Sequence, residues 1–171
     1  MVTVEELLED AAIKAYLLRL IGEEGMLLLE RFPSEGEFSD EDLAEKTGIN
    51  LNSVRHTLYT LYEKRLAEYR RLKNAETGWL TYLWKLTLDR ISDAIAEDMQ
   101  LVLEKLETRK TYEEENVFFT CKACGRFTFN EVVDIGFICP ACGKELEHFE
   151  NETLLAALCR RAEAMRQCLG K

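Results

Sequence analysis

The sequence predicts a mainly α-helical protein with small β elements, divided into two parts. Three observations lead to this prediction. Apolar residues recur at spacings of three and four over residues 51–61, residues 79–86 are rich in aromatic and β-prone side chains, and two Cys-x-x-Cys pairs lie within residues 121–142. Hydrophobic residues make up 47% of the 171 residues and charged residues 32%, so the chain can bury a core.

A helix is expected near the start of the chain. Thr3 and Glu6 fit a capping box, in which each side chain accepts a hydrogen bond from the other residue's backbone. Gly22 and Gly25 are predicted to break this helix, because glycine is a poor helix former. The helix then continues to Phe32, and a loop is expected after it.

The next segment has the pattern of a helix-turn-helix motif. A capping signal at residues 39–42 begins a short helix over residues 41–46. Gly48 can adopt the positive φ that ends such a helix, and Asn50 can cap a second helix over residues 51–65. One apolar stripe runs along the second helix, formed by Leu51, Val54, Leu58 and Leu61.

Two strands are expected directly after the second helix. Residues 66–72 alternate between apolar and polar side chains, residues 79–86 favour a strand, and residues 73–78 form a turn-like link. A helix-turn-helix followed by a β-hairpin is a winged helix. We assign residues 1–86 to this domain.

A long linking helix is expected over residues 87–112. Its apolar residues recur every three or four positions: Leu88, Ile91, Ile95, Met99, Val102 and Leu106. This stripe is expected to pack against the winged helix. The alternative is that the stripe forms a coiled coil with a partner helix. The stripe covers fewer than three heptads, which is too short to establish a coiled coil. Residues 105–115 are mostly charged and polar, and they mark a domain boundary.

Four cysteines predict a metal site. Fourteen residues separate two Cys-x-x-Cys pairs, and the two-residue gap lets both sulfurs of one tight turn converge on a cation. We predict one structural zinc ion per chain, in a ribbon over residues 113–148, held by Cys121, Cys124, Cys139 and Cys142. An iron or iron-sulfur site is the alternative. The acidic N-terminal segment does not resemble a secretory signal, so we expect a cytoplasmic protein. The cytoplasm is reducing, and a disulfide framework is therefore disfavoured.

The rest of the ribbon and the tail are predicted with less detail. Residues 127–138 are expected to form short strands around Gly136. Asn151 can cap a terminal helix within residues 149–171. Cys159 and Cys168 lie nine residues apart, on opposite faces of that helix, and are interpreted as ordinary thiols.

Nothing in the sequence predicts an enzyme. A shell of four cysteines is closed and leaves no position for a reactive water, so a zinc-dependent enzyme is the disfavoured alternative. The sequence has no nucleophile elbow and no phosphate-binding loop. The carboxylates lie on helical charge faces, where they are usually solvated.

The charge of the chain is unevenly distributed. The net charge is −10, with −9 in residues 1–49, +4 in residues 50–90 and −5 in residues 91–171. A strongly acidic chain repels the phosphate backbone at long range. Only the central segment, which contains the hairpin, could therefore approach nucleic acid.

The hairpin combines basic and aromatic side chains: Arg70, Arg71, Lys73, Trp79, Tyr82 and Trp84. Such a set can bind a single nucleic-acid strand by charge and stacking, and exposed aromatic residues can equally bind a protein. The alternative is that Tyr82 and Trp84, which share a strand face, fill the core behind the hairpin. Trp79 is the better candidate for exposure, because it lies next to Gly78 at the tip.

The order of these parts resembles archaeal transcription factor E, which corresponds to the alpha subunit of the eukaryotic factor TFIIE. The resemblance covers roughly Met1 to Glu150. The segment Leu43–Ile49 is common among winged helices. The acidic balance and the aromatic wing with Gly78 and Trp79 are more specific, since ordinary winged-helix DNA-binding proteins are basic.

This resemblance implies a basal transcription initiation factor of an archaeal cell, without catalytic activity. It implies docking on the RNA polymerase clamp, contact with the displaced strand of promoter DNA, and help in promoter opening. TATA-binding protein and a second subunit are further candidate partners. The positions that carry over to the polymerase or DNA contact are Arg70, Arg71, Lys73, Gly78, Trp79 and Tyr82.

A winged-helix repressor or metal-responsive regulator is the alternative function. Such a protein would read duplex DNA through the exposed side of its second helix, where Asn52 and Arg55 lie. It would bind paired half-sites as a dimer, joined through the stripe from Leu88 to Leu106.

Overall fold

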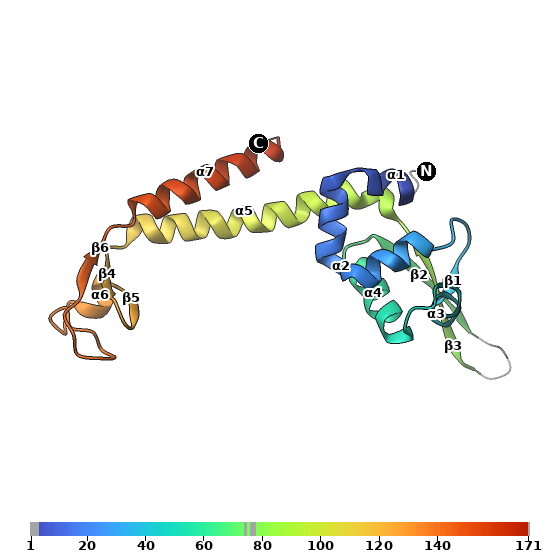
Figure 1. Ribbon diagram of the computed structural model, residues 1–171, viewed down its shortest axis with the longest axis horizontal. Helices are drawn as coiled ribbons and strands as arrows, with labels where there is room; N and C mark the ends of the chain where they lie inside the picture. The colour runs from blue at the N-terminus through green and yellow to red at the C-terminus, as the bar shows by residue number, and fades with distance from the viewer. Residues whose placement is uncertain (1–3, 74, 76–77, 171) are drawn as a thin grey trace. The chain divides into compact units, whose positions relative to one another are not determined.

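The computed structural model describes residues 4–73, 75 and 78–170. The chain forms two compact units, Met1–Ala96 and Glu97–Lys171, and the boundary between them falls inside helix α5 (Ile91–Glu115) (Figure 1). Thr3 of the expected capping box lies outside the described residues, as does part of the turn expected at residues 73–78. None of the helices in the described ranges is both long and apolar enough to span a membrane.

The first unit begins with two helices, α1 (Val4–Glu9) and α2 (Ala11–Arg31). Asp10 separates them, and its carboxylate accepts hydrogen bonds from the backbone N–H groups of Ala12 and Ile13 at 2.7 and 3.2 Å. Asp10 is therefore the N-cap of α2. This break is not evident from the sequence, because Asp10 follows other acidic residues and resembles one more solvated carboxylate.

The two glycines of α2 behave differently. Gly22 has φ 69° and interrupts the helix, as predicted. The prediction that Gly25 breaks the helix is wrong, because Gly25 continues it and is buried. A Cβ atom at Gly25 would lie 2.5 Å from the Cβ of Ile21, so this position requires glycine for close packing.

The predicted helix-turn-helix is present as α3 (Asp40–Thr47) and α4 (Leu51–Glu63). The Ser39 hydroxyl accepts a hydrogen bond from the Asp42 N–H at 3.0 Å, and the Asp42 carboxylate accepts one from the Ser39 N–H at 3.3 Å. Gly48 ends α3 with φ 71°. The Asn50 side chain accepts a hydrogen bond from the Asn52 N–H and caps α4. These local signals were all visible in the sequence.

The predicted hairpin is also present, with one strand more than expected. Strand β2 (Ala67–Lys73) pairs antiparallel with β3 (Leu80–Leu86), in a register from Ala67 opposite Leu86 to Lys73 opposite Leu80. The additional strand, β1 (Phe38–Ser39), pairs with β3, so the strand order is β1-β3-β2. The fold is therefore a winged helix-turn-helix, and the hairpin is its wing.

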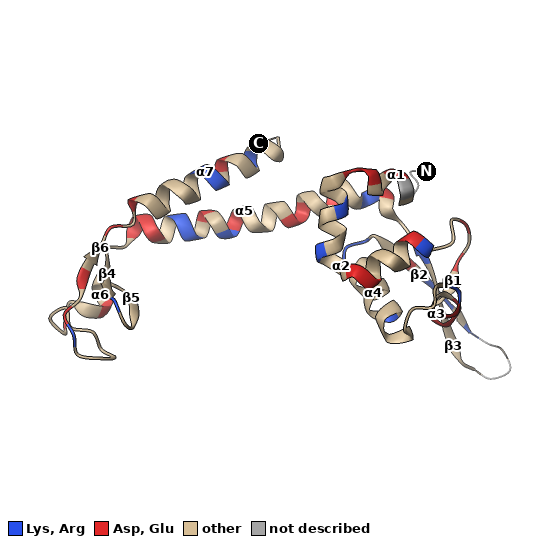
Figure 2. Ribbon diagram, viewed as in Figure 1, with Lys and Arg blue, Asp and Glu red and all other residues tan. Residues whose placement is uncertain are grey.

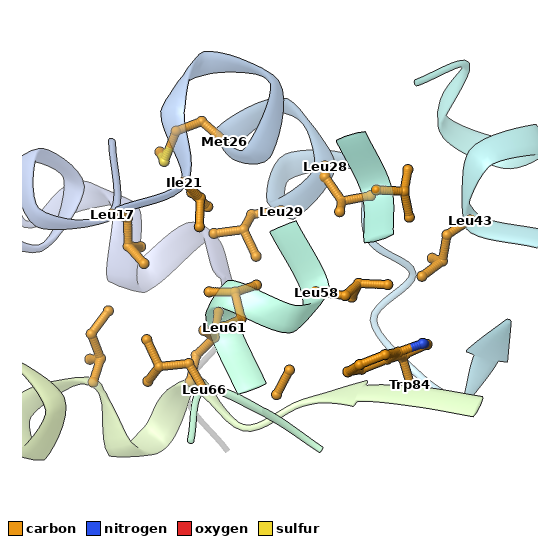
Figure 3. Packing of buried hydrophobic residues seen from close by; sticks show 14 of the residues in the cluster. Leu17, Ile21, Met26, Leu28, Leu29, Leu43, Leu58, Leu61, Leu66 and Trp84 are labelled. Atoms are coloured by element: carbon orange, nitrogen blue, oxygen red, sulfur yellow. The ribbon is translucent and has the colours of Figure 1, made fainter. Parts of the chain in front are cut away.

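One hydrophobic core joins the helices of the first unit to the wing (Figure 3). Val54, Leu58 and Leu61 of α4 are fully buried, as their stripe predicts. Trp84 of the wing is only 2% exposed and packs in the same cluster. Beyond the wing, the short 3₁₀ helix η1 (Leu88–Arg90) and the first turn of α5 add Leu88, Ile91 and Ala94 to this core.

The second unit contains the rest of α5, a ribbon and a terminal helix. The ribbon sheet has the order β5-β4-β6, from the strands β4 (Phe118–Cys121), β5 (Gly125–Thr128) and β6 (Glu147–Phe149). The prediction of strands over residues 127–138 holds only at the two ends, where β5 includes Phe127 and Thr128 and Ile138 forms an isolated bridge with Glu145; α6 (Phe129–Val132) lies between them. The Glu131 carboxylate accepts hydrogen bonds from both the N–H and the hydroxyl of Thr128, so Thr128 and Glu131 stabilise a helical turn.

Two helices run side by side in the second unit. α7 (Glu152–Cys168) lies along α5, and Arg166 of α7 binds Glu107 of α5 at 2.7 Å (Figure 1). α5 remains helical through the polar residues 105–115, where the sequence suggested a boundary. Asn151 is at the N-cap position of α7, but its side chain makes no capping hydrogen bond and contacts Glu113 instead. The division into four domains remains a prediction.

Candidate metal centre and wing surface

The four predicted cysteines come together at one end of the ribbon. Their Sγ atoms all lie within 4.8 Å of one another, and those of Cys121 and Cys142 are 3.5 Å apart. Sulfurs bound to one tetrahedral metal ion at ~2.3 Å would be separated by about 3.8 Å. Cys121 and Cys139 are buried, whereas Cys124 and Cys142 are exposed. The four thiols can therefore hold one metal ion near the surface.

Tight turns in the backbone bring the sulfurs together. The Cys124 N–H donates to the Cys121 carbonyl at 3.3 Å, and the Gly143 N–H donates to the Cys139 carbonyl at 2.8 Å. Gly143 has φ 70°, which a side chain would strain. This is why a glycine after the second cysteine suits such a turn.

The protonation of the thiols is uneven. Hydrogen bonds from the Ala123 N–H and from Cys142 lower the pKa of Cys121 to about 7. The hydrogen bond with Cys142 and burial raise the pKa of Cys124 to about 12. Several thiolates this close repel one another, so a bound cation is needed to hold them all deprotonated.

A buried carboxylate lies beside the ribbon. Glu113 of α5 is 1% exposed, and its carboxylate accepts hydrogen bonds from Arg126 at 2.5 and 3.1 Å, from Arg109 at 2.5 Å and from the Asn151 side chain at 2.9 Å. These residues, which we call the Glu113 cluster, join α5, β5 and the start of α7. The cluster is not evident from the sequence, because Glu113 is the first of three glutamates in a charged run.

The structure separates the basic residues of the wing. Arg70 and Arg71 point to opposite faces of β2, since neighbouring strand residues alternate. Arg70 donates two hydrogen bonds to Glu37, at 2.8 and 2.5 Å, and this contact raises the pKa of Arg70. Arg71 lies over the rings of Tyr69 and Tyr82, each at 5.7 Å. Only Arg71 and Lys73 share a face, so the structure does not bring the three basic residues together.

Exposed apolar side chains flank the tip of the wing on both strands. Gly78 has φ 74°, and Trp79 beside it is 77% exposed. Leu72 and Leu80 are also exposed near the tip. By contrast, Trp84 is part of the core, as one of the two sequence interpretations held.

Three tyrosines that were not selected from the sequence, Tyr59, Tyr62 and Tyr69, join Tyr82 and continue from the wing onto α4. Tyr62 lies 5.0 Å from Tyr69, and Tyr69 lies 5.2 Å from Tyr82, while Tyr59 contacts Trp84 at 5.3 Å. We call Tyr59, Tyr62, Tyr69 and Tyr82 the tyrosine row. Tyr59 and Tyr62 are exposed, and Tyr82 is half-buried. The row depends on the pairing of β2 with β3 and on the position of α4, which the sequence alone does not specify.

The exposed side of α4 is poorly suited to reading DNA. Arg55 is bound within the chain, to the carboxylate of Asp40 and, at 2.8 Å, to that of Glu41. The first turn of α3 contains three acidic residues, which would repel phosphates (Figure 2). Asn52 remains exposed. A repressor would read bases with Asn52 and Arg55. Because Arg55 is bound to acidic residues of α3, only Asn52 remains for this role.

We expect the isolated protein to bind duplex DNA weakly and without sequence preference. Non-specific dissociation constants are typically about 10⁻⁴–10⁻⁶ M at physiological salt. Titration of labelled duplexes measures this, and the Arg55→Ala variant should bind about as well as wild type, because Arg55 is already paired with Asp40 and Glu41. Nanomolar, sequence-selective binding that Arg55→Ala abolishes would favour the repressor.

Fold and site together define a winged helix-turn-helix protein with a four-cysteine ribbon. A family model for the TFIIE alpha subunit matches residues 11–116. Transcription factor E of Methanoregula boonei is 63% identical over 168 residues, covering 98% of this chain and 97% of that protein. Those of Methanospirillum hungatei and Haloarcula marismortui are 53% and 47% identical, covering 99% and 97% of this chain and 99% and 94% of theirs.

The chain belongs to the TFIIE alpha subunit family. It is a transcription initiation factor, which confirms the resemblance seen in the sequence and disfavours the repressor. The family is not enzymatic, in agreement with the sequence analysis. The match to the Methanoregula boonei protein extends beyond Glu150, so it includes the terminal helix that the resemblance left unassigned.

Proposed function

We propose that this chain binds RNA polymerase through the tip of its wing and assists promoter opening. The observation that carries the proposal is Trp79, a tryptophan that is 77% exposed beside a turn glycine, in a protein of an initiation-factor family. A large exposed aromatic residue suits a pocket on a protein partner. The proposed partner surface is the polymerase clamp, which is the expectation from the resemblance.

The side of the wing that contains Arg71 supports a second contact, with the displaced promoter strand. Arg71 and Lys73 provide positive charge on the face where Tyr69 and Tyr82 lie. Bases can stack on tyrosine rings, and the contact tolerates different sequences. Because the rest of the chain is acidic, this contact would form only where polymerase places a separated strand next to the wing.

We further propose that the metal ion of the four cysteines is zinc, with a structural role. All four donors are sulfur, and their spacing fits a tetrahedral site. Such a site would hold the ribbon strands and leave no open position for a substrate. Contacts with TATA-binding protein and with a second subunit remain predictions from the resemblance alone.

Replacing Trp79 with alanine should weaken both polymerase binding and promoter opening. Truncation of a central interface tryptophan commonly costs about 2 kcal/mol or more, which is over tenfold in affinity. A factor that prefers the open complex by ~1.4 kcal/mol shifts opening about tenfold, and the variant should lose most of that shift. The measurements are binding to purified polymerase and the melted fraction at promoters that open poorly.

The matched control for this experiment is Leu18→Ala. Leu18 is an exposed large apolar residue of α2, outside the wing. It should behave as wild type in both measurements. If wild type neither bound polymerase nor changed melting at any promoter, the proposal would have to be abandoned. If Leu18→Ala lost as much as Trp79→Ala, the wing would not be the contact surface.

A further inference from the structure

One arginine connects all three strands of the ribbon to helix α5. Arg126 lies in β5, and its guanidinium group lies over the ring of Phe118 in β4 at 4.1 Å and over the ring of Phe149 in β6 at 5.0 Å. The same group donates hydrogen bonds to both oxygens of the Glu113 carboxylate in α5. Arg126 can therefore hold Glu113 in this way only while the three strands are in place.

The strands that position Arg126 end at the cysteines. Gly125, the residue before Arg126, pairs with Cys121 across β4 and β5, and Cys124 comes directly before Gly125. Metal binding converts four separate thiols into one rigid link between the two tight turns. The position of Arg126 therefore depends on the state of the four cysteines.

The Glu113 carboxylate also holds the start of helix α7. Asn151 is at the N-cap position of α7, and its side-chain amide donates to the Glu113 carboxylate at 2.9 Å and to the Glu113 backbone carbonyl at 2.8 Å. Because Glu113 is buried, its charge depends on a paired cation, and a buried charge that loses its partner is strongly destabilising. One carboxylate thus receives its counter-charge from the ribbon and fixes the beginning of the next helix.

We propose that metal binding by the four cysteines controls the attachment of the start of α7 to α5, through Arg126, Glu113 and Asn151. This coupling rests on the proposed structural role of zinc. In the metal-bound chain, the strands place Arg126 on Glu113, and Glu113 holds Asn151. When the metal is removed and the strands separate, Arg126 leaves the carboxylate. The carboxylate then turns toward water, and Asn151 loses its acceptor. Coupling between two sites is reciprocal, so Asn151 in turn strengthens metal binding.

Only the first turns of α7 are expected to respond to the metal. Toward its other end, Arg166 binds Glu107 of α5 at 2.7 Å, and Ala162 is 1% exposed. Neither Arg166 nor Glu107 belongs to the ribbon, so their contact is kept when the ribbon loses its strands. This gradient along α7 distinguishes the coupling from a general unfolding of the second unit.

The first test is amide hydrogen exchange of the full chain, with one equivalent of zinc and after zinc is removed by a chelator. Exchange over residues 152–158 should become at least about tenfold faster without zinc, and residues 162–168 should change less. Helix α4 of the first unit is the internal reference and should not change. If the ribbon lost its protection while the start of α7 kept its slow exchange, the coupling alone would be excluded.

The second test is the apparent zinc affinity of the full chain, measured by competition with a chelator. Asn151→Ala should lower the affinity by about five- to tenfold, although Asn151 lies outside the ribbon. Asn130→Ala is the matched control. Asn130 is exposed on α6 within the ribbon and takes no part in the Glu113 cluster, so this variant should bind zinc like wild type.

A double-mutant cycle tests whether the effect passes through the carboxylate. In the Glu113→Gln background, Asn151→Ala should cost less zinc affinity than in wild type, because the charged acceptor is already gone. Equal losses in both backgrounds, or a loss in Asn130→Ala as large as that in Asn151→Ala, would rule out the route through Glu113. A ribbon that stayed protected without zinc would contradict the structural role of the ion, and the coupling with it.

Discussion

Replacing Cys121 and Cys124 together with serine is expected to release the metal ion and unfold the ribbon over residues 117–147. Apart from the cysteines, the buried hydrophobic residues of the ribbon are Phe118, Val132 and Leu146, and further phenylalanines pack around the last two. So small a core does not stabilise a segment of this length, and the free energy of metal binding supplies the difference. Metal analysis should find about one zinc ion per wild-type chain and none in the double variant.

The other two cysteines provide the matched control. Cys159 and Cys168 are exposed on α7, away from the metal centre, so replacing both with serine should keep one zinc ion per chain and the same amide exchange in the ribbon. A ribbon that keeps its slow amide exchange in the Cys121→Ser, Cys124→Ser variant without bound metal would refute the structural role of the ion.

Replacing Glu113 with alanine should destabilise the second unit by about 3–5 kcal/mol. The substitution leaves Arg126 without its buried carboxylate partner, and breaking a buried ion pair by removing one side costs about this much. It also removes the acceptor for Arg109 and for the Asn151 side chain. Denaturant unfolding, followed by amide exchange in the second unit, measures the loss.

Glu114→Ala is the control for this substitution. Glu114 is the neighbouring glutamate, it is exposed, and its contact with Lys110 is an ordinary surface pair at 3.3 Å. Its replacement should change stability by less than about 1 kcal/mol. Equal effects of the two substitutions would mean that the Glu113 cluster does not stabilise the unit.

The Glu113 cluster also predicts a pH dependence. Burial alone would raise the pKa of Glu113, but hydrogen bonds from Arg126 and Asn151 and the charge of Arg126 outweigh it and lower the pKa below its ordinary value. A carboxyl whose pKa is lowered on folding stabilises the protein above its unfolded value, about 4.3, and loses that contribution as the pH falls through the folded value. Acid unfolding of wild type should therefore be steeper in this range than that of Glu113→Ala.

Much of the fold could be predicted because its signals are local. The Ser39–Asp42 capping box, Gly48 and the stripe of α4 each involve residues a few positions apart, and the structure confirms them. The cysteine spacing is local in the same sense within each pair, and the four sulfurs do converge.

The misses have a common physical cause in contacts between distant residues. Asn151 has the identity of a cap, yet a carboxylate 38 positions earlier binds its side chain. The tyrosine row joins α4 to two strands, and Arg55 has the identity of a base-reading residue until its partners in α3 are known. In each case the side chain's chemistry is evident from the sequence. Its partner lies far away in the sequence and becomes evident only in the folded structure.

Helix α5 also limits how this chain can be divided. Ile91 and Ala94 belong to the core of the first unit, whereas Leu103 and Glu113 are buried in the second. A winged-helix fragment that stops at residue 86 would lack part of its core, and a ribbon fragment that begins at residue 113 would lack Arg109. A chimera between relatives must therefore exchange α5 whole or join the two parents inside it, because neither end of this helix is a boundary between the two units.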